Sequence, residues 1–358
     1  MQFTLPFSAL PGNKLQRREF LDKYFPSDLI PFEELVDNEW RITSFIPDDP
    51  TYYPDPFIKK GLEGWFEQVS VEEMGNYWRI YKNAMLSFND SWSLLYWSLV
   101  VDWLRQRQVP LHNSLILFHV DDHKDFDSPL LTLGGENFEC IFSGRKVNFS
   151  DPRSIEQALI QKSIDIRSFI TPFVYSLPAI DFLHLRYADK NNHFEGHLEC
   201  AQVQDKLLAR GKWKPILKQT CHKTAHQYFL SSEISSLLKV VAKDSTIFLH
   251  LDCDGFNNRY NSDSLWEKQN NRFDPILEDI KEKIDELLHQ IASLELPVFI
   301  NVALSPGFFP AEFWKLICKH IFLKAEEYNL IKECEFSQYL KKIYPAKVLD
   351  EHLDTYFP

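Results

Sequence analysis

The feature that most constrains the fold is a series of short apolar runs separated by segments of helical pattern. The runs are apolar at nearly every position, which is typical of strands that are buried on both faces of a parallel sheet. They span residues 114–120, 180–187, 245–252 and 297–305. The helical segments span residues 91–107, 150–162, 233–242, 275–294 and 311–328. This alternation predicts an α/β fold in which helices cover a mostly parallel central sheet.

The N-terminal part of the chain has a different character, because it is rich in aromatic residues, prolines and acids. The stretch IPDDPTYYPDPF (46–57) contains four prolines, which predicts an irregular loop. We expect residues 1–80 to form an N-terminal extension packed on a main domain of residues 81–358. The extension is either a structural apron or an arm that grips a peptide.

Composition limits the class of protein. With 358 residues, 44% hydrophobic and 25% charged, the chain is typical of a soluble globular protein with a large core. Its formal net charge of −12 argues against a nucleic-acid or anionic-membrane partner. The six cysteines form no CxxC pair, which indicates reduced core thiols. The chain shows no signal-peptide pattern at its start and no membrane-spanning segment, so we expect a cytoplasmic protein.

Two of the predicted strands end in acidic residues. The stretch HVDDHKDFDSP (119–129) follows the first strand, and HLDCDGF (250–256) closes the third. A strand alternates its faces, so Asp121 and His123 point the same way, as do Asp252 and Asp254. Asp125 can rejoin them once the chain turns past the strand end. Because sites in such sheets form at the carboxyl ends of strands, these five residues should meet in one crevice.

Four buried carboxylates in one crevice need compensation by cations, since each uncompensated charge costs several kcal/mol. Two divalent ions would offset them, and oxygen-rich ligation with one imidazole favours Mn²⁺ over a structural zinc site. An isolated Asp-x-Asp is more often a turn or a helix cap, but two such motifs after buried strands favour a binuclear site. Cys253, between the paired aspartates, should face away into the core.

Other histidines have both a structural and a functional interpretation. His119 and His250 precede the first aspartate of each motif by two residues, so they should lie one level deeper on the same face. There they either hydrogen-bond a metal ligand or are satisfied core histidines. In CHKTAH, His222 and His226 would lie one helical turn apart, as a zinc pair or as a solvated helix face.

These motifs carry a family resemblance over about residues 89–310. Asp-x-His-x-Asp after one strand and Asp-x-Asp-Gly after a later one resembles the arginase and ureohydrolase superfamily, relatives of the histone deacetylases. HVDDHKD and FITPFVYSLPAIDFLHLRY (169–187) are more similar to a branch that includes the peptide arginases, which convert arginine side chains of ribosomal peptides to ornithine. The resemblance implies a three-layer arginase-like α/β sandwich and two Mn²⁺ bridged by hydroxide. It also implies that Asp125 orients this hydroxide, which attacks the guanidinium carbon and releases urea.

The chain departs from the family pattern at several positions. The family's sixth ligand, a histidine, falls on Ser91 in FNDSWS, where Asp90 could substitute. Asp127 replaces an asparagine, and LGGENF (133–138) does not match the loop that grips free arginine, which favours a peptide substrate. The family's proton-shuttling histidine is also missing from its place, and His193 or His197 in NNHFEGH could replace it, although such histidines usually lie on the surface.

Guanidinium recognition requires a further carboxylate, for which Asp274 is the candidate and Glu267 its rival. Asp274 precedes Pro275, so a helix cap is the alternative interpretation. SPGFFP (305–310) should form a rim of the crevice.

The sequence hypothesis is therefore a Mn²⁺-dependent peptide arginase that binds an arginine-containing precursor peptide, with no nucleic-acid or membrane partner. Its oligomeric state stays open. The alternatives are another binuclear amidinohydrolase, a deacetylase-like amidase, or a non-catalytic peptide-binding relative. The amidase is less favoured, because the chain lacks the adjacent His-His pair on which deacetylases rely.

Overall fold

The central sheet contains the four predicted strands, with ends shifted by one or two residues. The computed structural model describes residues 2–26, 29–109, 115–135, 137–189, 193–269 and 272–349. The predicted strands are β6 (Leu115–Val120), β10 (Ile180–Leu185), β14 (Thr246–Asp252) and β15 (Val298–Ala303). They are joined by β4 (Trp78–Tyr81), β5 (Ala84–Ser87), β11 (Phe194–Gln204), β12 (Trp213–Thr220) and β13 (His226–Ser231).

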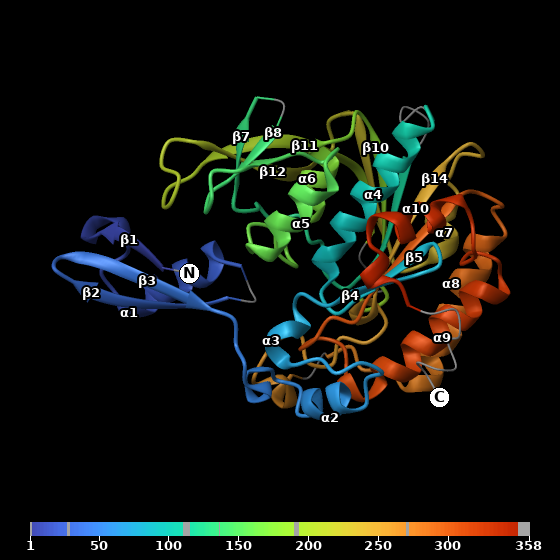
Figure 1. Cartoon of the computed structure of the whole chain (residues 1–358), viewed down its shortest axis with the longest axis horizontal. Helices are drawn as coiled ribbons and strands as arrows, with labels where there is room; N and C mark the ends of the chain where they lie inside the picture. Colours follow the sequence, from blue (N-terminus) through green and yellow to red (C-terminus); the bar gives the residue numbers. More distant parts are fainter. Residues whose placement is uncertain are drawn as a thin grey trace.

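Strand pairing makes this sheet mixed but mostly parallel. Within the described ranges it has nine strands in the order β12-β11-β13-β10-β6-β14-β15-β5-β4. The neighbours from β13 to β5 are all parallel, whereas the outer pairs at both edges are antiparallel. The predicted α/β class with a mostly parallel central sheet is therefore confirmed (Figure 1).

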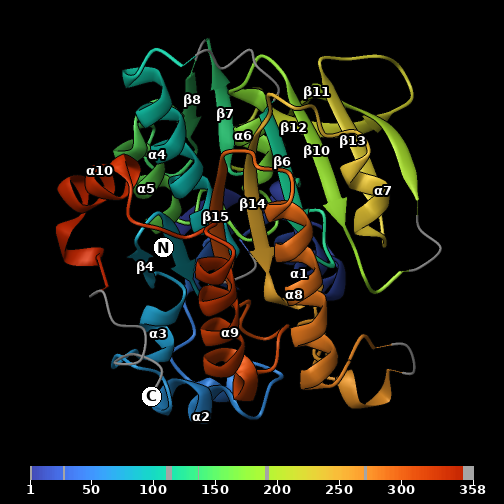
Figure 2. The ribbon, with the colours of Figure 1, turned by 90° about the vertical axis from the view of Figure 1, so that its right-hand side faces the viewer.

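Each face of the sheet has its own apolar core cluster, because successive strand side chains point to opposite faces. Ile116 and Phe118 of β6 belong to the first cluster, whereas Leu115 and Leu117 belong to the second. The first cluster contains buried residues of α2 (Ile58–Glu63), α3 (Val71–Met74), α7 (Ile234–Leu238), α8 (Leu277–Ala292) and α9 (Trp314–Glu327). The second contains those of α4 (Ser93–Gln106), α5 (Pro152–Ile160), α6 (Ile170–Tyr175) and α10 (Glu335–Ile343). Figure 2 shows α8 and α9 in front of β14 and β15.

The predicted helices are present, and most are somewhat shorter than expected. The Asp151 side chain accepts a hydrogen bond from Arg153 N at 3.2 Å and caps α5, with Pro152 at the first helical position, as predicted. Of the predicted helix 233–242, only the residues of α7 (Ile234–Leu238) are helical. No helix in the described part of the chain is long and apolar enough to cross a membrane.

The helical interpretation of CHKTAH is wrong. Residues 221–225 form a turn between β12 and β13, and His226 is the first residue of β13. His222 is exposed in the turn and His226 is buried in the sheet, so the two are not on one helix face. The strands β11 and β12, which both precede this turn, were not predicted. Much of their surface is exposed, and they therefore lack a continuous apolar run.

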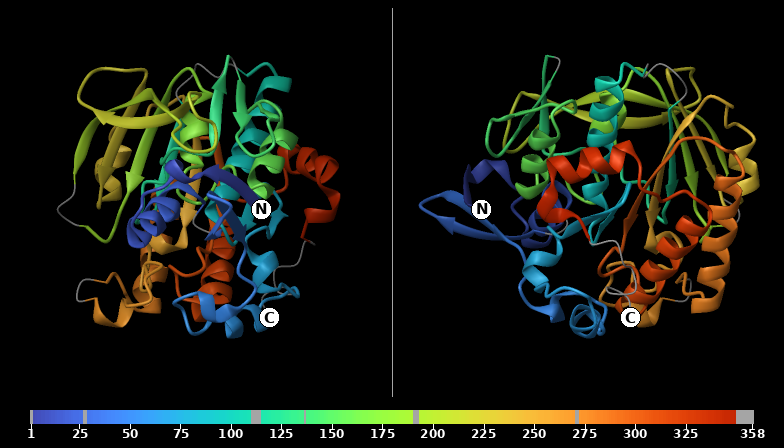
Figure 3. Two further views of the ribbon diagram at one scale, coloured as in Figure 1. Left: turned by 90° about the vertical axis from the view of Figure 1, so that its left-hand side faces the viewer. Right: turned by 45° about the vertical axis from the view of Figure 1, so that its right-hand side comes forward.

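The N-terminal residues form a small unit beside the main sheet. It contains β1 (Gln2–Pro6), α1 (Lys14–Tyr24), β2 (Ile30–Val36) and β3 (Glu39–Phe45), with strand order β1-β3-β2. Its core cluster includes Leu130 and Leu207 from later parts of the chain, and the unit projects to one side of the molecule (Figures 1 and 3). Residues 46–57 are irregular apart from the short helix Pro50–Tyr52. The boundary between extension and main domain was predicted at residue 80. Strand β4 of the central sheet runs across this position and pairs with β5.

Candidate metal centre

The two acidic motifs lie side by side at the carboxyl edge of the sheet. Strands β6 and β14 are parallel neighbours, with His119 opposite His250 and Val120 opposite Leu251. After β14 the chain turns through a short helix (Cys253–Gly255) that crosses close to the end of β6. A Cβ atom on Gly255 would lie 2.7 Å from the backbone nitrogen of Asp121, so only glycine allows this approach. The close contact brings the acids of both motifs together.

Five buried aspartates form what we call the acid cluster. They are Asp90, Asp121, Asp125, Asp252 and Asp254. Three groups of three residues bring ligand atoms within 4.8 Å of one another, and all three contain Asp121. Two of them take their carboxylates from the acid cluster: Asp121, His123 and Asp254 form one, and Asp90, Asp121 and Asp252 form the other. The third is Asp121 with the buried histidines His119 and His250. Each of the first two groups could hold a metal ion with mainly oxygen ligands.

Burial and mutual repulsion perturb these carboxyl groups strongly. Burial, together with the charges of Asp252 and Asp121, raises the pKa of Asp90 well above its ordinary value. The pKa values of Asp125 and Asp252 are also raised well above the usual range, first by burial and then by neighbouring acids. Burial and the charge of Asp121 raise the pKa of Asp254 to about 7. The cluster therefore lacks enough positive charge to stabilise the ionised form of all its acids, although the charge of His123 opposes the rise at Asp121 and Asp254.

Several oxygens of the cluster are also without hydrogen-bond donors. Among the described residues, Oδ1 of Asp90 and the Oδ2 atoms of Asp121 and Asp125 are buried and make no hydrogen bond. Native proteins rarely leave buried polar atoms in this state. Buried carboxylate oxygens and one imidazole are the donor set that a divalent cation such as Mn²⁺ accepts. The residues present therefore fit a metal ion.

His123 is oriented toward the acids by a partner on its outer side. Its Nδ1 lies 3.0 Å from Oδ2 of Asp254 and 3.4 Å from Oδ1 of Asp121. Its Nε2 lies 3.3 Å from Oδ1 of Asn261, to which it can donate, and this leaves the Nδ1 lone pair for a metal. Burial alone would lower the pKa of His123, but Asp254 and Asp121 hold it well above the ordinary value. No motif in the sequence pointed to Asn261.

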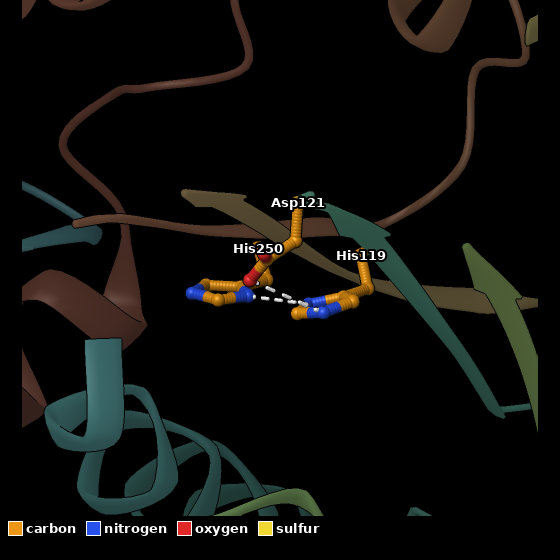
Figure 4. Close-up of side chains that lie close together, drawn as sticks. All are labelled: His119, Asp121 and His250. Carbon is orange, nitrogen blue, oxygen red and sulfur yellow. Dashed lines mark hydrogen bonds and ion pairs between the residues drawn. The ribbon is translucent and has the colours of Figure 1, made fainter. Parts of the chain in front are cut away.

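His119 and His250 lie beneath the cluster, as alternation along the strands predicts (Figure 4). Their rings are stacked, with Nδ1 atoms 2.7 Å apart. Nε2 of His119 lies 3.3 Å from Oδ2 of Asp121, 3.8 Å from Oδ2 of Asp125 and 3.3 Å from the His123 carbonyl oxygen. All three are acceptors, so Nε2 of His119 carries a hydrogen, and the two Nδ1 atoms share another. His119 thus donates to the His123 carbonyl oxygen, and its Nε2–H faces Oδ2 of Asp121 from below without forming a hydrogen bond to it.

Backbone conformation at the site is unusual in two places. Asp125 has a φ of 48° and Ser305 a φ of 43°, which is the left-handed region that favours glycine. Such conformations persist where the surroundings impose them, often at functional sites. Ser305 follows β15, and its hydroxyl donates to Oδ1 of Asp252 at 2.5 Å. The sequence prediction placed Ser305 in a rim loop and did not foresee this hydrogen bond.

A cavity of about 410 Å³ lies over the acid cluster. Four of the five acids line it, all except Asp121, together with His123. Pro306 and Phe308 of the SPGFFP segment form one wall, so this segment lies at the crevice as predicted. The rest of the lining includes Asp122, Lys124, Asp127, Arg167 and Arg186. Burial raises the pKa of Asp127, and the charge of Arg167 opposes this.

The remaining predicted site residues do not line this cavity, as far as the described residues define it. Asp274 accepts hydrogen bonds from Arg259 Nε at 2.8 Å and from Asn257 Nδ2 at 3.0 Å. Its alternative interpretation as a helix cap is wrong, because Ile276 is the N-cap of α8. Glu267 and His193 are exposed. As far as the described residues define the cavity, its lining includes neither of them, nor Asp274 or His197.

Asp90 rather than Ser91 reaches the acids. Both residues are buried in the short helix Asp90–Trp92 that precedes α4. Asp90 lines the cavity and belongs to one of the potential metal-binding groups. Ser91 does not line the cavity, as far as the described residues define it. The structure thus brings the expected substitute ligand to the other acids.

Cys253 packs into the first core cluster, away from the acids, as alternation predicts. Burial raises the pKa of its thiol, as expected for an inert core cysteine.

Comparison with known proteins adds no family assignment. A scan against protein-family models returns no match, and a search of the curated proteins finds none that is similar.

Proposed function

We propose that this chain is a Mn²⁺-dependent hydrolase of the arginase type, which converts arginine side chains of a peptide to ornithine and releases urea. The observation that carries the proposal is the pair of three-residue groups that share Asp121. They lie at the carboxyl ends of neighbouring parallel strands and contain carboxylate oxygens without donors. The core clusters on both faces of the sheet support the three-layer arginase-like sandwich as part of this proposal.

In this proposal, each of two ions has its own group of ligands. Asp90, Asp121 and Asp252 would hold one, and Asp121, His123 and Asp254 the other. Five carboxylates against two divalent cations leave one negative charge, which suits a cationic substrate. When bound, the ions would supply a nucleophilic water at neutral pH.

The side chains around the cavity have separate roles in this proposal. Asp125 accepts a hydrogen bond from the attacking water, and its raised pKa suits it to hold a proton. Asp127, in the cavity wall, offers a carboxylate to the N–H donors of a guanidinium group. Its place in the wall favours it over Asp274, whose Oδ1 atom already accepts from Arg259 and Asn257.

The position of the segment that would bind a free amino acid supports a peptide substrate. The segment 133–138, which stands where arginases grip free arginine, lies in the hairpin of β7 (Leu131–Gly134) and β8 (Asn137–Cys140). Among its described residues, none lines the cavity. A peptide-bound arginine needs no such contacts, because its amino and carboxyl groups are in amide bonds.

The test is a mass-spectrometric assay with two substrates. The chain and Mn²⁺ are incubated with a blocked arginine-containing peptide or with free arginine. The expected result is a loss of CN₂H₂ from the peptide, with release of urea. Asp252→Ala should abolish the loss, whereas Asp151→Asn should retain it, because Asn caps α5 as well as Asp does. Turnover by Asp252→Ala, or no turnover of any peptide, would contradict the proposal.

The same assay separates the alternative functions. Turnover of free arginine or another free guanidine, without turnover of the peptide, would identify a different amidinohydrolase. Removal of an acetyl group from acetyl-lysine would identify an amidase. Mn²⁺ content near zero after incubation would identify a non-catalytic binding protein. The buried pair His119 and His250 does not favour an amidase, because neither ring is part of the cavity lining defined by the described residues.

A further inference from the structure

A second cavity of about 160 Å³ lies beside the first one. It is formed where α1 ends, between the loops 127–130 and 163–168 and the start of β12. Asp127 and Arg167 line both cavities, so the two are neighbours. A peptide whose arginine side chain enters the first cavity would bring an adjacent residue to the second.

Lys214 is the feature of the second cavity that requires an explanation. Its exposed fraction is only 7%. Its Nζ lies 5.0 Å from the centroid of the Tyr24 ring. No hydrogen bond or ion pair of Lys214 exists among the described residues. An ammonium group has three N–H donors. The nearby charges of Asp205 and Asp165 act on Lys214, but no protein acceptor among the described residues lies within hydrogen-bond distance of its Nζ, so these donors are open to an acceptor from outside the chain.

A second unused donor lines the same cavity. The hydroxyl oxygen of Ser128 is buried and has no hydrogen-bond partner within the described ranges. Ser128 directly follows Asp127, whose backbone N–H donates to the Arg167 carbonyl oxygen at 2.8 Å. One ammonium and one hydroxyl in a small cavity form a donor pair for a single carboxylate group.

Three of the other charged groups of the cavity, Asp165, Arg167 and Lys23, are already engaged. Asp165 accepts from the Ser168 hydroxyl at 2.5 Å and faces Arg167 Nε at 3.3 Å. Arg167 also donates to the Phe25 carbonyl oxygen at 2.6 Å. Lys23 pairs with Glu19 at 3.0 Å. Lys214 is the cation of this lining that has no acceptor within hydrogen-bond distance among the described residues.

The sign and number of the charges select the ligand. Lys23 is paired with Glu19, so the rest of the lining has two cations, Arg167 and Lys214, and two acids, Asp127 and Asp165. The charges of Asp205 and Asp165 also act on Lys214. A phosphate dianion would be repelled by these acids, whereas a single carboxylate brings only one negative charge to the unused N–H donors of Lys214. The chain as a whole carries a net charge of −12, so it has no general attraction for acidic molecules. Recognition of an acid therefore requires a local site such as this one.

We propose that the second cavity binds the side-chain carboxylate of an acidic residue close to the target arginine, through Lys214 and Ser128. The position of this residue relative to arginine rests on the proposed function, but the carboxylate site itself does not. The site would make the enzyme selective for arginines with an acidic neighbour.

The test uses blocked peptides with one arginine and one aspartate that is moved through the neighbouring positions. Each peptide has a partner in which asparagine replaces the aspartate. Binding is measured by calorimetry on the Asp252→Ala chain, which should not consume the peptide, and turnover on the wild-type chain. In one register, the aspartate peptide should bind about tenfold more tightly than its asparagine partner.

Variants assign this preference to Lys214. Lys214→Met should abolish it, and Lys214→Arg should keep part of it. Lys212→Met is the matched control, because Lys212 is exposed and pairs with Glu139. Methionine has nearly the length of lysine, and thermal melting verifies that the variant is folded. Ser128→Ala is a second variant, which should reduce the preference about threefold.

Each outcome decides the proposal. No preference for aspartate in any register, or a preference that survives in Lys214→Met, would overturn the carboxylate site. Urea release without an aspartate preference would leave the proposed function standing and reject this site. A preference that depends on Lys214, in a chain that releases no urea from any peptide, would keep the site and reject the arginase proposal.

Discussion

Two acid-rich regions of the molecule differ in how their carboxylates are compensated. In the first, which we call the Arg259 network, the guanidinium of Arg259 binds both Asp274 and Glu312. In the second, the acid cluster, no Lys or Arg forms an ion pair with any of the five aspartates among the described residues. The chain therefore supplies its own cation in one region and omits it in the other. The omission identifies the acid cluster as the place where an external cation fits.

The same contrast holds between two consecutive residues. Both oxygens of Asp122 are occupied, one by Arg186 Nε at 2.7 Å and the other by Asn258 Nδ2 at 2.8 Å. Asp121, one residue earlier, has a buried Oδ2 atom without a hydrogen bond. Asp121 faces the other acids, whereas Asp122 faces partners that the protein provides. Position relative to the strand end, rather than residue type, decides which acid is left for a ligand.

The largest expected effect concerns metal affinity. Asp121→Ala removes the residue shared by both metal-binding groups, so Mn²⁺ affinity should fall by a factor of about a thousand or more, roughly 4 kcal/mol. Asp274→Ala, in the Arg259 network, should leave affinity within about threefold. Calorimetric titration with Mn²⁺ measures both values. Equal affinities of the two variants would remove the distinction between the regions.

A smaller effect is expected from the histidine that lies beneath Asp121. His119→Phe removes the Nε2–H that faces Asp121, so Mn²⁺ affinity should fall about 10- to 100-fold. His119→Gln, which retains an N–H donor, should recover part of this loss. His226→Phe is the control, since β13 is separated from β6 by β10 in the sheet. A loss of affinity in His226→Phe as large as in His119→Phe would show a general packing effect.

The metal-free protein should show stability changes of opposite sign in the two regions. Asp90→Asn removes a buried acid that is repelled by its neighbours, and should raise the free energy of unfolding by about 2 kcal/mol. Arg259→Met leaves Asp274 and Glu312 without their cation and should lower it by about 2 kcal/mol. Denaturant unfolding in the presence of a chelator measures both. Destabilisation by Asp90→Asn would show that the acid cluster is balanced without metal.

The sequence predicted those parts of the site that depend on local pattern. Burial on both faces makes β6 and β14 continuous apolar runs, so their ends could be located from the sequence. Because side chains alternate along a strand, Asp121 and His123 could then be predicted to point to the same side. Asp90 was reached only through a family resemblance, because nothing in its local sequence distinguishes it from a helix cap.

The parts that the sequence did not predict depend on contacts between distant segments. The hydrogen bond of Ser305 to Asp252 and that of His123 to Asn261 join loops that meet only after folding. Strands β11 and β12 carry exposed polar residues and pair over a long hairpin, so no apolar periodicity marks them. Asp274 was assigned to the substrate because its partner Arg259, fifteen residues earlier, could not be foreseen.

The smallest expected effect is a pH dependence that distinguishes the metal-free from the metal-bound protein. The acids of the cluster have raised pKa values when folded, with that of Asp254 at about 7, so the folded state binds more protons than the unfolded state above the ordinary Asp range. Stability of the metal-free protein should therefore fall as pH rises, by at most about 1.4 kcal/mol per pH unit for each proton. His123, whose folded pKa is also raised, acts in the same direction.

This fall should appear only above about pH 6.5, because the buried histidines oppose it at lower pH. His119 and His250 have pKa values lowered by burial, to about 3 for His250, so they destabilise the folded state as the unfolded histidines take up protons. Unfolding free energies between about pH 6.5 and about pH 8.5 measure the effect. Saturating Mn²⁺ should reverse its sign, since ion binding to the ionised acids strengthens with pH. A metal-free protein that becomes more stable over this range would show that its acids are already compensated by the chain.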